Sequence, residues 1–172
     1  AVHLDGARIF HAAVALNCPV TVFTRSCDSI MFCLSKGLGA PAGSILAGTE
    51  SFIGQARRYR RLLGGGMRQI GILAAAGRLA LKHIPHLAAD HRRAFRLAEG
   101  LVRLPSLKVS PFPPPTNIVM LDVKDTGLST QEFIARLSIF NVKAIDFGEH
   151  LVRLVTHRDI SDDDIDFALA AV

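Results

Sequence analysis

Residues 110–117 read SPFPPPTN and set the strongest limit on what this chain can fold into. Proline stands at positions 111, 113, 114 and 115. Each proline fixes φ and removes a backbone donor, so neither a helix nor an interior strand can run through this segment. We therefore predict a stiff, extended connector. The order of predicted strands and helices differs between the parts of the chain before and after this segment. We therefore expect two domains, residues 1–104 and residues 105–172.

The part before the connector alternates short apolar runs with helical periodicity, which is typical of parallel strands joined by helices. The helix at residues 67–83 is apolar almost all round, so we predict that it is buried on most faces. The fold class predicted here is α/β, with a partial sheet of the parallel type. We expect strands at residues 2–4, 29–34 and 44–48 and helices at 7–17, 51–63, 67–83 and 86–104.

The part after the connector has the pattern of a small α+β domain. Ser129 and Glu132 form a capping box, and Ser161 is expected to cap a final helix that carries three acids in its first turn. We expect strands at residues 117–123, 142–148 and 150–157 and helices at 129–140 and 161–172.

Charge and composition argue against two classes of partner. The net charge is +5, and the excess is concentrated at residues 56–63 and 90–100, which are both predicted to be helical. A nucleic-acid site would place aromatic side chains among these charges, and only Tyr59 and Phe95 are there, so solvated helix faces are the better interpretation. No apolar run approaches the length of a membrane span. We expect neither nucleic acid nor membrane as a partner.

The three cysteines are odd in number and lack metal-binding spacing, which indicates reduced thiols in an intracellular compartment, either cytoplasm or mitochondrion. Ala1 is not an initiator methionine, and the sequence after it resembles a strand already under way. We therefore expect a further segment before Ala1.

A single lysine follows the second predicted strand, in the motif SKGLGAPAGS at residues 35–44. A dinucleotide fingerprint is excluded, because the glycines at 37, 39 and 43 have the wrong spacing and Pro41 blocks the helix that such a site needs. Lys36 could be an ordinary charged residue at a strand end. It could instead be kept out of water as a free amine that forms a Schiff base, with glycines that let a flat cofactor approach the backbone.

Asp5 favours the second interpretation of Lys36. It ends another predicted strand, in the motif HLDGAR at residues 3–8. A pyridoxal phosphate site needs a carboxylate opposite its lysine, because the carboxylate keeps the pyridine nitrogen protonated and makes the ring an electron sink.

Four segments resemble the low-specificity L-threonine aldolases, which are pyridoxal 5'-phosphate enzymes of the aspartate-aminotransferase fold. The resemblance covers the later half of such an enzyme, so residues 1–104 would be the end of the cofactor-binding large domain. It implies retro-aldol cleavage of threonine to glycine and acetaldehyde, a small amino-acid substrate, and a homodimer or homotetramer. The segments are HLDGARIF, DSIMFCLSKGLGAPAGSILAG, LLGGGMRQIGILAAAG and VRLVTHRDIS.

The resemblance also assigns roles. Lys36 would bind the cofactor as a Schiff base, Asp5 would pair with its pyridinium nitrogen, and Arg8 would lie beside its phenolic oxygen and the substrate. Arg153 would bind the substrate carboxylate through its planar guanidinium. Arg68 would reach the cofactor phosphate, as Arg61 would in a weaker assignment.

Several alternatives stay open at this stage. His3 could line the cofactor pocket or be a packed structural residue, His11 could be a surface or packing residue, and His157 could orient Arg153 or be incidental. We expect no metal site, because His3 and Asp5 lack further ligands nearby. The chain could also be an inactive remnant of the enzyme, or another enzyme of the same fold such as a hydroxymethyltransferase or an aminotransferase.

Overall fold

The computed structural model describes all 172 residues. Contacts divide the chain into two compact units, Ala1–Leu87 and Ala88–Val172, each with its own sheet and its own buried apolar cluster. The predicted α/β class is confirmed. The predicted domain boundary after residue 104 stays a prediction. None of the helices combines the length and the apolar character that crossing a membrane requires.

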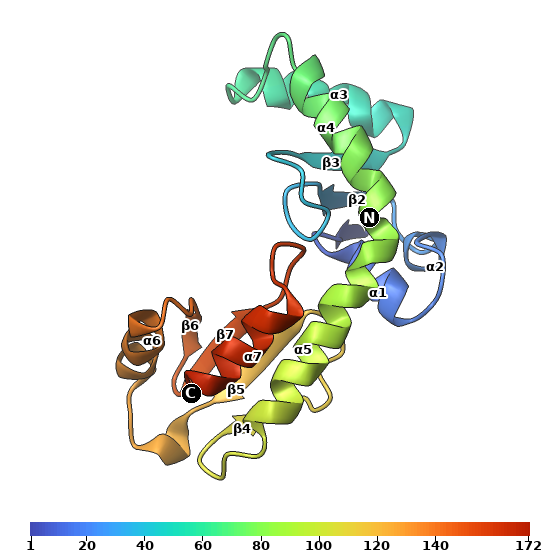
Figure 1. Ribbon diagram of the computed structural model, residues 1–172. Coiled ribbons are helices and arrows are strands. Elements are labelled where there is room, and N and C mark those ends of the chain that lie inside the picture. Colours follow the sequence, from blue (N-terminus) through green and yellow to red (C-terminus); the bar gives the residue numbers. More distant parts are fainter. The chain divides into compact units, whose positions relative to one another are not determined.

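The elements of the first unit follow the predicted order, with ends that shift by a few residues (Figure 1). There are two additions, a helix of a single turn at Thr21–Thr24 and a 3-10 helix at Leu81–His86. The first carries no apolar periodicity, which is why the sequence pattern does not reveal it. The elements are β1 (His3–Asp5), α1 (Ile9–Ala15), α2 (Thr21–Thr24), β2 (Ser29–Cys33), β3 (Ser44–Gly48), α3 (Glu50–Leu62), α4 (Gly71–Ala80) and the 3-10 helix η1 (Leu81–His86).

The sheet of the first unit has the order β1-β2-β3 and is mixed. Strands β1 and β2 are parallel, as predicted, with His3 beside Ser29. Strands β2 and β3 are antiparallel, with Cys33 beside Ser44, so the prediction of a parallel-type sheet is wrong for β3. Only residues 34–43 separate these strands, and a parallel return needs a longer crossover, usually with a helix.

Helix α4 is far more exposed than its apolar sequence predicts. Gly77 and Ala80 are its only buried residues, while Ile72 is 84% exposed. The prediction of burial on most faces is therefore wrong. Burial needs a packing partner on each face, and within its unit this helix meets the apolar cluster along one line. That cluster consists of Leu34, Leu38, Ala40, Ala80 and Leu87.

The second unit is an antiparallel sheet of order β4-β5-β7-β6 packed against helices (Figure 1). Its core joins Leu97 and Leu101 of α5 to Val152 and Leu154 of β7. The elements are α5 (Leu87–Leu101), β4 (Lys108–Val109), β5 (Ile118–Asp122), the 3-10 helix η2 (Lys124–Thr126), α6 (Thr130–Ile139), β6 (Ile145–Gly148), β7 (Leu151–Val155) and α7 (Asp162–Ala170).

Both predicted caps of this unit are confirmed. Ser129 and Glu132 form a capping box at α6, and Ser161 forms one with Asp164 at α7. The proline-rich segment contains neither helix nor strand, as predicted. It connects β4 to β5 inside the second unit, and its Phe112 ring stacks on Phe95 of α5 with centroids 6.2 Å apart.

Candidate functional site

Asp5 and Lys36 lie at or just beyond the carboxyl ends of neighbouring parallel strands. Asp5 is the last residue of β1 and lies beside Met31 of β2. Strand β2 ends at Cys33, three residues before Lys36. The carboxyl ends of parallel strands meet at one edge of a sheet, which is where α/β proteins commonly bind ligands. The topology therefore brings the predicted carboxylate and amine to the same edge.

The turn after β1 orients the Asp5 carboxylate. Its Oδ1 accepts a hydrogen bond from the Ala7 backbone N–H at 3.1 Å. The next residue, Gly6, donates its own N–H to the Met31 carbonyl at 2.9 Å. A Cβ at Gly6 would lie 2.9 Å from that same carbonyl oxygen, which is too close. Glycine is therefore required for this turn to lie against β2.

Residues 34–43 form a closed loop that presents Lys36. The Leu34 N–H donates to the Gly43 carbonyl at 3.0 Å, and the Gly39 N–H donates to the Lys36 carbonyl at 2.8 Å. Leu38 is buried at 3% exposure, whereas Lys36 is exposed. The apolar side chains thus anchor the loop while its lysine points outward.

Each glycine of this loop has an identifiable structural reason. Gly39 and Gly43 have φ values of 76° and 105°, a region that disfavours side chains. Gly37 faces α1, because a Cβ there would lie 2.1 Å from Nε2 of His11. The idea that these glycines make room for a cofactor is therefore wrong for Gly37. His11 is 2% exposed, so it is a packing residue and not a surface residue.

Helix α4 supports the same loop through a second close approach. A Cβ at Gly77 would lie 2.9 Å from Cδ1 of Leu34. The first residue of the loop is therefore in direct contact with the backbone of α4, while Gly37 rests on His11 of α1. Two helices hold the loop that carries Lys36.

The predicted dry environment of Lys36 is not observed. Lys36 and Asp5 are both exposed, and neither side chain forms an ion pair. The physical reason is local: the loop buries its apolar residues below the backbone and no other segment of the first unit covers its outer side. The amine and the carboxylate are both accessible to a ligand.

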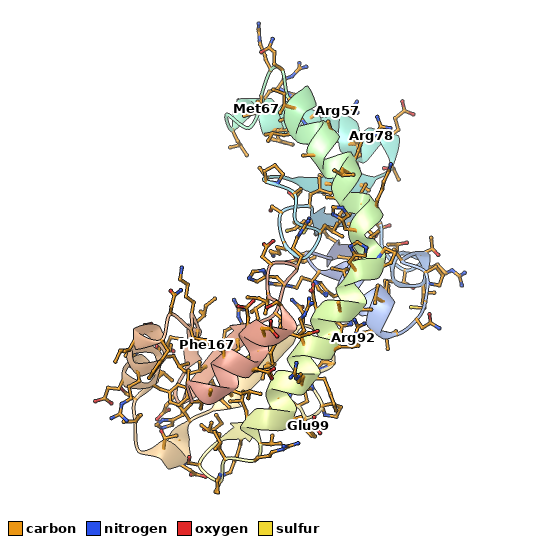
Figure 2. All side chains as sticks on the ribbon, in the orientation of Figure 1. Arg57, Met67, Arg78, Arg92, Glu99 and Phe167 are labelled. Carbon is orange, nitrogen blue, oxygen red and sulfur yellow. The ribbon has the colours of Figure 1, made fainter.

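Three arginines of the first unit were also predicted to bind the cofactor or the substrate, and they differ in how far along the sequence they lie from Asp5 and Lys36. Arg8 is half-buried and occupies the position just before α1, three residues after Asp5, without a side-chain capping hydrogen bond. Arg61 lies in the last turn of α3, and Arg68 in the exposed segment between α3 and α4. No hydrogen bond or ion pair links either of these two arginines to the Lys36 loop. Figure 2 shows the neighbouring Arg57 and Met67 projecting from the same region.

Arg153, the predicted carboxylate-binding residue, belongs to β7 in the second unit. Its guanidinium carbon lies 5.1 Å from the centroid of the Phe147 ring. Its Nε is buried without a hydrogen-bond partner, and no carboxylate forms an ion pair with it. The sequence analysis missed Phe147. Ile145 is the cross-strand neighbour of Arg153, and Phe147 follows it by two residues. Pairing the two predicted strands could therefore have placed Phe147 near Arg153.

The remaining histidines have identifiable neighbours. His3 Nδ1 lies 2.8 Å from the Ser29 hydroxyl, across the β1-β2 pair. His157 Nδ1 lies 3.6 Å from Asp159 Oδ2, so its charged neighbour is Asp159 and not Arg153. Nowhere do three or more His, Cys, Asp or Glu side chains gather in a way that could hold a metal ion.

Comparison with known proteins identifies the family. The model of the beta-eliminating lyase family matches residues 1–126. The chain belongs to this family. It is 41% identical to the low-specificity L-threonine aldolase 1 of Arabidopsis thaliana, over 98% of this chain and 48% of that protein. It is 43% identical to the low specificity L-threonine aldolase of Escherichia coli strain K12, over 94% of this chain and 46% of that protein.

The fold of this family member also matches solved structures. A crystal structure from Listeria monocytogenes EGD-E, assigned as an L-allo-threonine aldolase, superposes with a TM-score of 0.80 at 21% identity. The match covers 98% of this chain and 50% of that one. The chain thus spans about half the length of the relatives that it matches.

Proposed function

We propose that this chain is the lysine-bearing part of a pyridoxal-phosphate-dependent aldehyde-lyase that cleaves L-threonine and L-allo-threonine to glycine and acetaldehyde. The observation that carries the proposal is the pair of Asp5 and Lys36 at one edge of two parallel strands. The names of the two relatives described above give the substrate class. Both are named low-specificity enzymes, which is why the proposal includes both threonine isomers.

The residues present fit pyridoxal phosphate. The Lys36 amine is exposed and engaged in no ion pair, so it is available to a carbonyl group. The Asp5 carboxylate is fixed by the Ala7 N–H and faces the same edge of the sheet. An amine and a carboxylate that a flat pyridine ring can join are the donor set that this cofactor requires. Arg153 adds a guanidinium without a carboxylate partner.

Each residue has a distinct proposed task. Lys36 Nζ would bind the cofactor covalently and, once displaced by the substrate amine, would hold or transfer a proton. Asp5 would hold the proton at the pyridine nitrogen, and Arg8 would lie beside the phenolic oxygen. Arg153 would orient the substrate through its carboxylate, and Arg68 would bind the cofactor phosphate. The chemistry that pyridoxal phosphate supplies when bound is an electron sink for the Cα–Cβ bond that breaks.

We also propose a homodimer or homotetramer as the working form. Several large apolar side chains from the end of α3 to the first turn of α4 are exposed, and Leu62, Leu63 and Ile72 are 75%, 82% and 84% exposed. Exposed apolar side chains in such number are typical of interaction sites in soluble proteins. Sedimentation velocity would test this proposal, since a strict monomer at all concentrations contradicts it.

The test of the proposed function is cofactor binding at Lys36. Pyridoxal phosphate should acquire the visible absorbance band of a lysine-bound imine with the unchanged protein and with Lys82→Ala, an exposed lysine of the same unit. Lys36→Ala should abolish the band and lower kcat for acetaldehyde release by about three orders of magnitude. Acetaldehyde formation without folate or a keto acid distinguishes this activity from hydroxymethyltransferase and aminotransferase activity.

The absence of the band in the unchanged protein would contradict the proposal and favour a non-catalytic remnant. A band that persists in Lys36→Ala would contradict the assignment of the lysine.

A further inference from the structure

Arg153 lies on the face of its sheet that the helices do not cover. In β7, Val152 and Leu154 point into the core that α5, α6 and α7 complete. Arg153 alternates with them and has Met120 of β5 and Ile145 of β6 as its cross-strand neighbours. Ile145 is 50% exposed. The guanidinium therefore lies among apolar side chains at a surface, where a bound anion would be less screened than in water.

The guanidinium presents one edge outward. Its Nε is buried and has no hydrogen-bond partner, whereas the two terminal nitrogens are not buried. No side chain of the protein bonds them. A carboxylate approaching this face would meet the terminal nitrogen pair, the geometry in which arginine binds a carboxylate with two parallel hydrogen bonds.

The Arg153 guanidinium lies over the face of the Phe147 ring. The ring centroid lies 5.1 Å from the guanidinium carbon, within the range of a cation–π contact. Phe147 is 53% exposed although it is a large apolar residue. A packing role in the core does not explain this residue, because its ring lies on the outer face with Arg153.

A bulge in β6 sets the position of the Phe147 ring. The register between β6 and β7 shifts between Asp146 and Gly148, and Gly148 has a φ of 134°. The Asp146 carboxylate accepts hydrogen bonds from the Gly148 N–H at 3.1 Å, from the Thr130 hydroxyl at 3.1 Å and from the Gln131 amide at 2.7 Å. The first turn of α6 therefore holds Asp146, and the Asp146 carboxylate in turn holds Gly148, so both chain neighbours of Phe147 are hydrogen-bonded. Bulges often redirect side chains next to active sites.

We propose that Phe147 is the positioning residue for Arg153, holding the guanidinium plane so that its terminal nitrogens bind the carboxylate of the amino-acid substrate. The identity of the ligand as the carboxylate of an amino acid rests on the proposed function. A guanidinium fixed in advance loses less conformational entropy when it binds, which raises affinity without any contact between Phe147 and the ligand.

The test maps the reactivity of Arg153 with phenylglyoxal, an arginine reagent, by mass spectrometry of peptides. The first readout is the modification rate at Arg153. The second is the concentration of glycine, the smallest amino-acid carboxylate, that halves this rate. The variants are Phe147→Ala, Phe147→Leu and Phe147→Tyr. Phe167→Ala is the matched control, since Phe167 is 57% exposed and belongs to α7, the helix that packs on the core face of the sheet, opposite Arg153 (Figure 2).

Loss of the ring should raise the modification rate about threefold or more and the half-protecting glycine concentration about fivefold, as expected for losing one cation–π contact at a half-exposed site. Phe147→Tyr keeps a ring and should stay within about twofold of the unchanged protein on both readouts. Phe167→Ala should change neither. Phe147→Leu keeps apolar bulk, so it gives the same answer if the alanine variant does not fold.

The outcomes separate this inference from the proposed function. Unchanged rates and unchanged glycine protection in both Phe147→Ala and Phe147→Leu would overturn the positioning role, whatever the cofactor band at Lys36 shows. Lack of glycine protection in the unchanged protein, with the cofactor band present, would overturn the carboxylate site at Arg153 while Lys36 keeps its assignment.

Discussion

At the scale of single residues, Gly37 shows how a glycine beside a functional group can be misread. Its neighbour Lys36 suggests that the missing side chain makes room for a ligand. In the structure, the space that a Cβ would fill holds the ring of buried His11. Glycine at this position lets the lysine-bearing loop rest on α1, so it determines where Lys36 is held.

Gly37→Ala should lower the free energy of unfolding by about 1–3 kcal/mol, the usual cost of forcing extra volume into a packed site. It should also weaken the absorbance band with pyridoxal phosphate, because the loop must shift. The matched control is Gly54→Ala on α3, where nothing lies within 4 Å of an added Cβ. That change should stabilise the protein by up to about 1 kcal/mol.

Urea unfolding measures both effects. A double-mutant cycle sharpens the test, since Gly37→Ala should cost less in a His11→Ala background than in the original one. Equal costs in the two backgrounds would contradict the contact.

At the scale of elements, the ends of α6 and α7 depend on local hydrogen bonds that the sequence already specifies. The Ser129 backbone N–H and hydroxyl lower the pKa of Glu132, and the Ser161 hydroxyl and backbone N–H lower the pKa of Asp164. A carboxyl whose pKa is lowered in the folded state stabilises the fold above its unfolded pKa. That contribution is lost as the pH falls through the lowered folded value.

Ser129→Ala and Ser161→Ala should each lower the free energy of unfolding at pH 7 by about 1 kcal/mol. The difference from the unchanged protein should shrink as the pH falls below about 4, the ordinary range of Asp and Glu side chains, because the carboxylates become protonated in both proteins. Thermal unfolding followed by circular dichroism measures it. The control is Ser138→Ala in α6, whose hydroxyl bonds only the Ile134 carbonyl. A pH-independent difference would contradict the role of the carboxylates.

At the scale of the molecule, one buried residue connects three distant parts of the second unit. The Thr156 hydroxyl, just after β7, donates to the Asp90 carbonyl in α5 at 2.7 Å. The Thr156 carbonyl accepts from Asn117 Nδ2, just before β5, at 2.7 Å. All three residues are at most 2% exposed. These bonds fix the ends of two strands against a helix.

Thr156→Val keeps the shape and removes the hydroxyl, so it should lower the free energy of unfolding by about 1–2 kcal/mol because the Asp90 carbonyl loses its buried donor. Ser138→Ala removes a hydroxyl with a bond of similar length, 2.8 Å, at an exposed position. It should cost less than about 0.5 kcal/mol. Denaturant unfolding of the two variants side by side tests the difference, and equal costs would count against the network.

The sequence by itself determined most element positions, the capping box of α6, the Ser161 cap of α7 and the parallel direction of β1 and β2, because periodicity, caps and turn residues act within a few neighbouring residues. The sequence also indicated that β3 is antiparallel, although the prediction did not use this information: the connection formed by residues 34–43 is too short for a parallel crossover. Only the tertiary structure decided the exposure of α4, the contact of Gly37 with His11 and the ring of Phe147 over Arg153. Each of these depends on which surfaces distant segments present to one another, and a local pattern does not encode that.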